Sequence, residues 1–315
     1  MTATAPSARR KSSIGNRIKR CIPMYLMALP GLVYLIINNY IPMSGIIIAF
    51  KNVNWRKGIL GSPWAGFSNF EYLFKTRDAW TITRNTIGYN LVFILLGTLM
   101  AIAIAILLNE IRSKKLKQVY QTVFLLPYLI SIVVVSYLVF AMLSIDSGFI
   151  NKSILSALGK DAIAWYTEPK YWPFILVIVY LWKTFGYNSI IYYATLVGVD
   201  HSYYEAAAID GATRWQQVCH VTLPALTPTI ITLTLLSVGK IFYSDFGLFY
   251  QVPMNSGPLL DVTNTIDTYV YRGLIQLNDL GMSSAAGVYQ SLVGFVLVLA
   301  ANYVVSRVDK DNALF

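Results

Sequence analysis

The sequence predicts an all-α membrane protein with six transmembrane helices, and three observations support this fold class. The chain has 315 residues, of which 56% are hydrophobic and only 13% are charged, whereas a typical soluble domain has about 25% charged residues. Its mean hydropathy is +0.55. Six apolar stretches are each long enough to cross a hydrocarbon core, which takes roughly 20 helical residues. These stretches are continuous rather than alternating, which excludes a membrane β-barrel.

Polar segments separate the six predicted spans. In chain order the spans cover about residues 24–50, 86–108, 119–143, 172–197, 223–243 and 287–305. The first span follows a basic stretch and is too long for the apolar core of a cleavable signal peptide, so we expect a retained helix. The predicted parts are a basic cytoplasmic segment at 1–22, a six-helix permease-type domain at 23–308 and a cytoplasmic tail at 309–315.

The distribution of positive charge predicts that both termini face the cytoplasm. The four segments that would then be cytoplasmic carry 13 Lys and Arg in 64 residues, whereas the three opposite segments carry 10 in 105 residues. Short loops decide topology, and the loop at 111–118 holds four basic residues, while Lys51, Arg56 and Lys57 favour the opposite orientation. Because the basic residues form no single stripe, the net charge of +10 reflects topology rather than nucleic-acid binding. The loop at 199–222 is then cytoplasmic.

The loop after the first span is rich in aromatic residues, namely Trp55, Trp64, Phe67, Phe70, Tyr72, Phe74 and Trp80. Aromatic residues of this kind form a belt at the membrane interface. They could equally form a docking surface for an external partner. The sequence leaves both interpretations open.

The polar loop at 199–222 carries signals for a small rigid helix. Ser202-x-x-Glu205 fits a capping box, which predicts a helix start near Tyr203. The alanines at 206–208 favour a helix and have little bulk, so another protein can approach the backbone closely. Gly211 tolerates the left-handed conformation that ends many helices.

A second helix is predicted directly afterwards. Thr213 and Gln216 repeat the capping pattern. Leu223-Pro224 marks the start of the fifth span, because proline in the first turn of a helix lacks only an N–H that would be unpaired there. The loop is thus expected to form a helix, a turn and a helix.

These residues resemble the EAA loop of binding-protein-dependent ABC importer permeases. The family pattern EAA-x3-G-x9-I-x-LP is matched in spacing by Glu205, Ala206, Ala207, Gly211, Leu223 and Pro224, with Val221 in place of Ile. Gly66–Phe70, Asn85-Thr86, Asn255–Pro258 and Gly281 with Ala285-Ala286 are similar to marks of the sugar-uptake, maltose-type branch, with Ser256 replacing one glycine. Residues 38–61 look most like the LplB-type polysaccharide permeases.

The resemblance implies partners and roles. It implies a multi-pass protein of the bacterial plasma membrane that works with a cytoplasmic ABC ATPase dimer, a second homologous permease and an extracytoplasmic solute-binding protein. By this resemblance Glu205, Ala207 and Gly211 belong to a coupling helix seated in a cleft of the ATPase. The full set of expected ATPase-coupling residues is Glu205, Ala206, Ala207, Gly211, Leu223 and Pro224. No cofactor is expected in this chain, since ATP and Mg would bind the partner ATPase.

Two lysines lie in apolar spans, where charges are rare and usually face a cavity or a partner. Lys183 lies within the fourth predicted span, and Lys240 lies near the end of the fifth, where it could also snorkel to the interface. Tyr180, Lys183, Thr184 and Tyr187 recur at helical spacing, as do Lys240, Tyr243 and Ser244, with Asp245 adjacent. Aromatic rings and hydroxyls suit a sugar, and two lysines would favour an acidic oligosaccharide such as a uronate. In the maltose-type permeases the resemblance places sugar contacts near the first of these groups, although the residue types differ.

Two other function classes compete with an importer permease. A membrane-embedded transferase needs acid–base groups or metal ligands, yet the only two histidines are His201 and His220, and neither a zinc motif nor a phosphate-binding loop is present. The two cysteines, Cys21 and Cys219, form no disulfide framework. A stand-alone channel or secondary carrier would not need an EAA-like loop.

Overall fold

The computed structural model describes residues 14–308, which are almost entirely helical. In that part of the chain the β contacts amount to one isolated bridge, between Lys51 and Trp64. Five helices are long and apolar enough to cross a membrane, or six if a bent pair counts as one span. The all-α class is therefore confirmed. The basic residues Arg9, Arg10 and Lys11 and the predicted tail at 309–315 lie outside the described residues.

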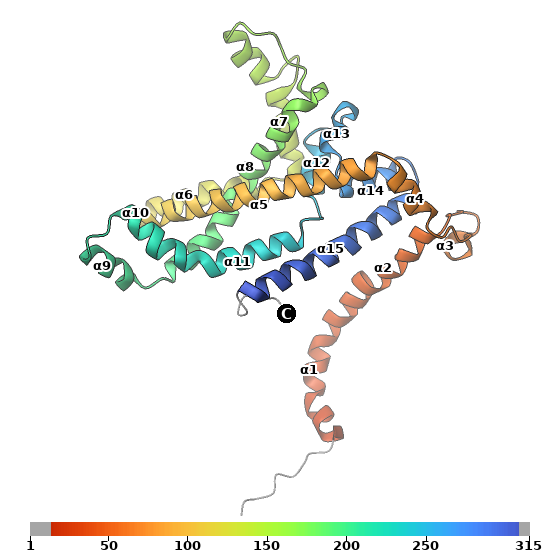
Figure 1. Ribbon diagram of the computed structural model, residues 1–315, viewed down its shortest axis with the longest axis horizontal. Helices are drawn as coiled ribbons and strands as arrows, with labels where there is room; N and C mark the ends of the chain where they lie inside the picture. The colour runs from red at the N-terminus through yellow and green to blue at the C-terminus, as the bar shows by residue number, and fades with distance from the viewer. Residues whose placement is uncertain (1–13, 309–315) are drawn as a thin grey trace, which may run out of the picture.

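The first span extends away from the other helices over most of its length, and its last part packs against α15 (Leu280–Val308) (Figure 1). It runs continuously over Ile22–Phe50 as α1 (Ile14–Leu35), η1 (Ile36–Tyr40), α2 (Ile41–Met43) and η2 (Ser44–Phe50). Most of its side chains from Ile22 to Ile47 are exposed, and Ala49 near its end is buried. The short helices α3 (Gly58–Gly61) and α4 (Ser68–Lys75) follow it. One aromatic cluster joins the end of η2 to α4 and the loop before it, and consists of the rings of Phe50, Trp64, Phe67 and Phe70.

The second and fourth spans, α5 (Asp78–Glu110) and α8 (Trp172–Val197), pack against each other and form the centre of the molecule. Ala101 and Ala105 of α5 are fully buried against Tyr192 and Leu196 of α8, so small side chains let the two helices approach closely. The second span begins eight residues before its predicted start at Thr86. Short helices η3 (Ile150–Leu155), η4 (Trp165–Thr167) and η5 (Pro169–Tyr171) precede α8.

The third span, predicted over 119–143, is a bent pair of helices rather than a single helix. It consists of α6 (Lys114–Leu129) and α7 (Ile132–Leu143), whose axes differ by 92°. Ile130 and Ser131 between them have extended backbones, with ψ of 131° and 145°. In Figure 1, α6 runs beside α5, whereas α7 turns away from that bundle.

The rest of the chain forms two long helices with short helices before and between them. Helices α9 (His201–Ile209), α10 (Arg214–Gln217) and η6 (Val218–Thr222) lead into α11 (Leu223–Gly239). Helices α12 (Phe246–Gln251), η7 (Gly257–Leu259), α13 (Leu260–Thr263) and α14 (Ile266–Ile275) precede α15 (Leu280–Val308). Helix α11 ends at Gly239, so the helical spacing predicted for Lys240, Tyr243 and Ser244 was wrong, because all three lie in the turn that follows.

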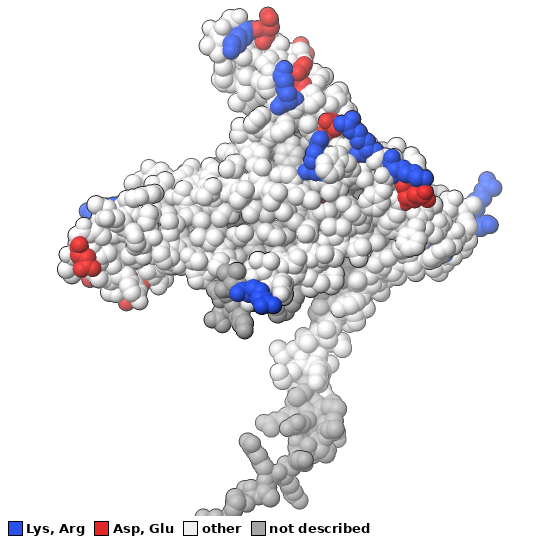
Figure 2. Space-filling model, in the orientation of Figure 1, with Lys and Arg blue, Asp and Glu red and all other residues white. Residues whose placement is uncertain are grey.

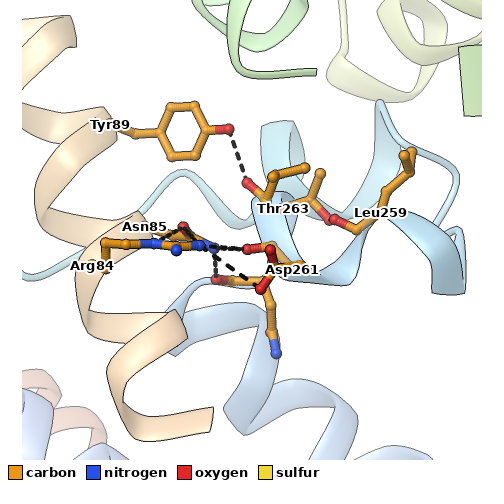
Figure 3. Close-up of polar contacts among 8 residues, drawn as sticks. Arg84, Asn85, Tyr89, Leu259, Asp261 and Thr263 are labelled. Atoms are coloured by element: carbon orange, nitrogen blue, oxygen red, sulfur yellow. Dashed lines mark hydrogen bonds and ion pairs between the residues drawn. The ribbon is translucent and has the colours of Figure 1, made fainter. Parts of the chain in front are cut away.

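Side chains of α5 fix the short helix α13 in place (Figure 3). Asn85 Nδ2 donates to the carbonyls of Asp261 and Asn264 at 3.0 and 2.9 Å, and the Tyr89 hydroxyl donates to that of Val262 at 2.8 Å. Thr86 Oγ1 accepts a hydrogen bond from the N–H of Ile266, the first residue of α14. Asn85 and Thr86 therefore provide hydrogen-bond partners for carbonyls at the end of α13 and for an N–H at the start of α14. Backbone groups at buried helix ends need such partners.

On the face shown in Figure 2, charged side chains gather on the lobe beyond α7 and near α3, α4 and α9, with a basic patch near the end of α15, and most of the middle carries no charge. Three buried clusters hold this apolar part together. One joins α5, α7, α8 and α12 around Trp172 and Phe249, a second joins α4, α5, α14 and α15 around Leu73 and Phe242, and the third is the α5–α8–α11 contact. This division fits a body that lies in lipid with polar ends in water.

Candidate functional site

Helix α9 begins with a side-chain cap, although not at the predicted residue. Asp200 is the N-cap, and its Oδ1 accepts a hydrogen bond from the N–H of Ser202 at 2.9 Å. The predicted capping box of Ser202 with Glu205 was therefore wrong, because the helix already includes His201 and Ser202. The hydrogen bonds from Ser202 hold the pKa of the Asp200 carboxyl below its ordinary value. Asp200 thus remains a charged cap at the positive end of the helix dipole.

The turn after α9 depends on Gly211. Its φ is +78°, the left-handed region that glycine adopts at helix ends. The N–H of Gly211 donates to the carbonyl of Ala208 at 3.1 Å, and that of Ala212 donates to Ala207 at 2.9 Å. The prediction of a glycine turn is confirmed. A Cβ at this glycine would meet nothing within 4 Å, so backbone conformation alone selects glycine here.

The second helix of the loop is capped as predicted. Thr213 and Gln216 form a full capping box, each pairing with the backbone of the other. From Arg214 the helix continues without a break through η6 into α11, so Pro224 lies within a continuous helix and not at the helix start that was predicted. The hydroxyls of Tyr204 and Thr222 lie 3.1 Å apart and join α9 to η6. The loop is therefore a helical hairpin whose two arms are joined by this contact. It lies at the left end of the molecule in Figure 1.

The hairpin exposes large apolar side chains. Tyr203 is 64% exposed, Ile209 is 87% exposed and Trp215 is 73% exposed. Glu205 and Ala206 are also exposed, whereas Ala207 is half-buried. An exposed apolar group rimmed by polar residues is typical of a protein interaction site.

A cavity of about 290 Å³ lies between α5, α8, α11 and the turn after α11. Its wall includes Asn90, Phe93, Tyr180, Asn188, Tyr192, Lys240 and Tyr243. The cavity is at the lower end of the usual size range of ligand pockets, about 300–1,000 Å³. Aromatic rings, amides and one ammonium group in a largely apolar region can stack on a sugar ring and hydrogen-bond to its hydroxyls.

Several residues of the cavity wall hydrogen-bond or stack with one another, but the ammonium of Lys240 takes no part in these contacts. The rings of Phe93 and Tyr180 stack with centroids 3.8 Å apart. Asn90 Nδ2 donates to the carbonyls of Ile241 and Tyr243, each at 2.9 Å, and so fixes the turn that carries Lys240. Lys240 is exposed, and within residues 14–308 its ammonium has no hydrogen-bond or ion-pair partner. It is the cavity residue most able to bind an anionic group.

The structure brings three of the eight predicted path residues, Tyr180, Lys240 and Tyr243, to the cavity. The other five are engaged elsewhere. Thr184 donates to the carbonyl of Tyr180, Tyr187 stacks on Tyr128, Ser244 donates to Asp267, Asp245 caps α12, and Lys183 donates to backbone carbonyls of the third span.

The cavity residues that sequence reasoning missed include Asn90, Phe93, Asn188 and Tyr192. A usable signal existed for the two asparagines, because a polar amide within an apolar span is costly unless it has partners or faces a cavity. Phe93 and Tyr192 carried no such signal, since aromatic residues are common throughout membrane helices.

Comparison with known families matches residues 94–310 to the family described as "Binding-protein-dependent transport system inner membrane component". The chain is 34% identical over 295 residues to "Protein LplB" of Bacillus subtilis (strain 168), covering 94% of this chain and 92% of that protein. It is 33% identical over 289 residues to the "Polygalacturonan/rhamnogalacturonan transport system permease protein YteP" of the same strain, covering 92% and 89%.

A solved structure has the same fold. A chain of a bacterial ABC transporter involved in the import of the acidic polysaccharide alginate superposes with a TM-score of 0.86 at 33% identity, covering 94% of this chain and 99% of that chain. A second structure, of the bacterial alginate ABC transporter in complex with alginate pentasaccharide-bound periplasmic protein, gives a TM-score of 0.85 over 94% of this chain and 98% of that chain.

Proposed function

This chain belongs to the family of binding-protein-dependent transport system inner membrane components, as a sugar permease that spans the bacterial plasma membrane several times, and from that premise we propose that it imports an acidic oligosaccharide. The observation that carries the proposal is the unpaired ammonium of Lys240 in a cavity of aromatic and amide side chains. At about 4 Å and an effective dielectric constant near 20, a carboxylate and an ammonium attract each other by about 4 kcal/mol. The similarity to permeases named for polygalacturonan and alginate transport supports an acidic solute.

The acidic preference is tested with one pair of probes. Pentagalacturonate and its methyl ester share their sugar and linkages and differ in carboxylate charge. The importer complex, purified in nanodiscs, is expected to bind the free acid about tenfold more tightly than the ester, which corresponds to about 1.4 kcal/mol. Equal binding of both probes, at low and high salt, would rule out recognition by charge.

We also propose that the hairpin of α9 and α10 lies in the cytoplasm and docks a dimeric ABC ATPase. The positive-inside rule supports the orientation, because the short loop before α6 carries Arg112, Lys114, Lys115 and Lys117. The exposed Tyr203, Ile209 and Trp215 supply apolar contact area. A short, capped and braced helix transmits a displacement to α11 as a rigid body, whereas a mobile loop would absorb it. Glu205, Ala206, Ala207, Gly211, Leu223 and Pro224 are the proposed coupling residues.

The family also bears on the energy source. The matched family consists of inner membrane components of transport systems, so this chain is a translocation subunit. We therefore assign ATP and Mg to the partner ATPase, with a second permease completing the path and a solute-binding protein delivering the sugar.

Gly211→Pro tests the coupling role. Proline fixes φ near −65°, which is incompatible with the +78° of this turn, and it removes the N–H that donates to Ala208. We expect ATP hydrolysis to persist while solute uptake by proteoliposomes falls about tenfold or more. Gly211→Asn is the matched control, because asparagine tolerates the left-handed region and a Cβ at this position would meet nothing within 4 Å. Normal uptake by the proline variant would contradict the coupling role.

A further inference from the structure

The break in the third span exposes backbone groups in a part of the molecule that lies in lipid or protein. The last four carbonyls of an α-helix have no partner within that helix. In a membrane each such group needs another partner, since water is not available to replace it. Helix α6 ends at Leu129, and the chain then turns by 92° into α7. The break therefore needs hydrogen-bond donors from elsewhere.

Lys183 of α8 supplies these donors. Its Nζ donates to the carbonyls of Tyr128 at 3.2 Å and Ile130, and at 3.4 Å to that of Pro127, which also accepts a hydrogen bond from the N–H of Ile130 at 3.3 Å. An ammonium has three N–H groups, so the three carbonyls use all of them. The positive charge also lies at the negative end of the α6 dipole. Within the described residues, no carboxylate lies within 4.0 Å of this ammonium.

The neighbours of Lys183 on α8 hold the same end of α6. Gly186 lies so close to α6 that a Cβ there would be 1.8 Å from the carbonyl oxygen of Phe124. The ring of Tyr187 stacks on that of Tyr128 with centroids 4.4 Å apart. Positions 183, 186 and 187 share one face of a helix. This face of α8 contacts α6 through the ammonium of Lys183, the close backbone approach at Gly186 and the stacked ring of Tyr187.

The start of α7 is fixed separately. Ser131 is its N-cap and accepts a hydrogen bond from the N–H of Val134 at 3.3 Å. Gly247 of α12 packs against Ile132, where a Cβ would be 2.8 Å from Cγ2. The break is therefore held on both sides, on the α6 side by Lys183 and on the α7 side by Ser131 and Gly247.

We propose that Lys183 is a positioning residue that holds the third-span break and does not bind the solute. Tyr180, which lines the cavity, lies on α8 one turn before Lys183. The Lys183 contacts thus fix the position of the cavity wall relative to the end of α6. This inference concerns the geometry of the break, so it stands or falls independently of the charge of the imported solute.

The test measures the break directly. In a Cys21→Ser, Cys219→Ser background, spin labels at Val123 on α6 and Leu138 on α7, which are 56% and 48% exposed, report the distance across the break in the assembled importer. We expect Lys183→Met to broaden or shift this distance distribution and to reduce uptake about tenfold. Lys183→Arg, which keeps charge and donors, is expected to restore the distribution and bring uptake within about twofold of wild type.

Two controls make the outcome decisive. Lys240→Met is expected to leave the distance across the break unchanged. If Lys183→Met does not assemble, Lys183→Gln replaces it, since an amide retains two N–H donors without charge. Its distance distribution is then expected to be broader than that of wild type or shifted from it. An unchanged distribution in Lys183→Met or Lys183→Gln, with a selective loss of pentagalacturonate binding over its methyl ester, would overturn the proposal and assign Lys183 to the solute.

Discussion

Lys183 and Lys240 both interrupt apolar stretches near aromatic residues, yet they lie in opposite surroundings. The ammonium of Lys183 donates to three backbone carbonyls at the end of α6. The ammonium of Lys240 lies at the cavity without a partner among the described residues. Intramembrane charges are taken by default as functional. The two lysines show that such a charge can instead stabilise a broken helix, and that the nearby backbone distinguishes the two cases.

The largest effect is expected at the helix contact beside Lys183. Gly186→Ala adds one methyl group that would lie 1.8 Å from the Phe124 carbonyl oxygen. Because backbone cannot move aside as a flexible side chain can, α6 must separate from α8. Overpacking of this kind costs about 1–3 kcal/mol or more, and we expect little assembled importer in purification yield and thermal-shift measurements.

Gly287→Ala is the matched control in another membrane helix, since a Cβ there would meet nothing within 4 Å. Alanine favours a helix over glycine by about 1 kcal/mol, so this variant should be as stable as wild type or slightly more so. Normal assembly of Gly186→Ala would indicate that the close contact between α6 and α8 is not required.

The next effect is expected at the cavity. Lys240→Glu replaces an unpaired cation with an anion, so it should weaken pentagalacturonate binding about 10- to 100-fold through like-charge repulsion. Binding of the methyl ester should change far less. Titration of the purified complex with both probes measures this. An equal loss for both probes would mean that Lys240 shapes the cavity without reading charge.

The smallest effect is expected at the α7 side of the break. Ser131→Ala removes the N-cap hydrogen bond to Val134, which costs roughly 1 kcal/mol. We expect a slightly lower melting temperature with uptake close to wild type, because Lys183 still caps α6. A loss of uptake as large as that of Lys183→Met would place the control of the break on Ser131.

Local signals in the sequence predicted the hairpin and the family well. The Thr213–Gln216 capping box and the Gly211 turn are confirmed, because each depends on residues within one turn of chain. The predicted membership of the sugar-uptake permeases is confirmed by the family match and by relatives at 33–34% identity. The start of α9 was misplaced, because Asp200 and Ser202 are both acceptable caps and the sequence does not rank them.

The third span and the turn after α11 could not be predicted in the same way. Hydropathy records how apolar a segment is, and residues 119–143 remain apolar through the bend. Pro127 was a visible sign of a weakened helix, but the donor that stabilises the break is Lys183, more than fifty residues away. Likewise Asn90 of α5 fixes the turn after Gly239 through the carbonyls of Ile241 and Tyr243. Such tertiary partners carry no periodic pattern.

The central claim is that Lys240 faces the solute and Lys183 holds the backbone. The most direct measurement is the ratio of the affinities for pentagalacturonate and its methyl ester in Lys240→Met and Lys183→Met, measured side by side in the purified complex. We predict that Lys240→Met lowers this ratio about tenfold, whereas Lys183→Met leaves it within about twofold of wild type even if both affinities fall. A lowered ratio in Lys183→Met together with an unchanged ratio in Lys240→Met would contradict the account.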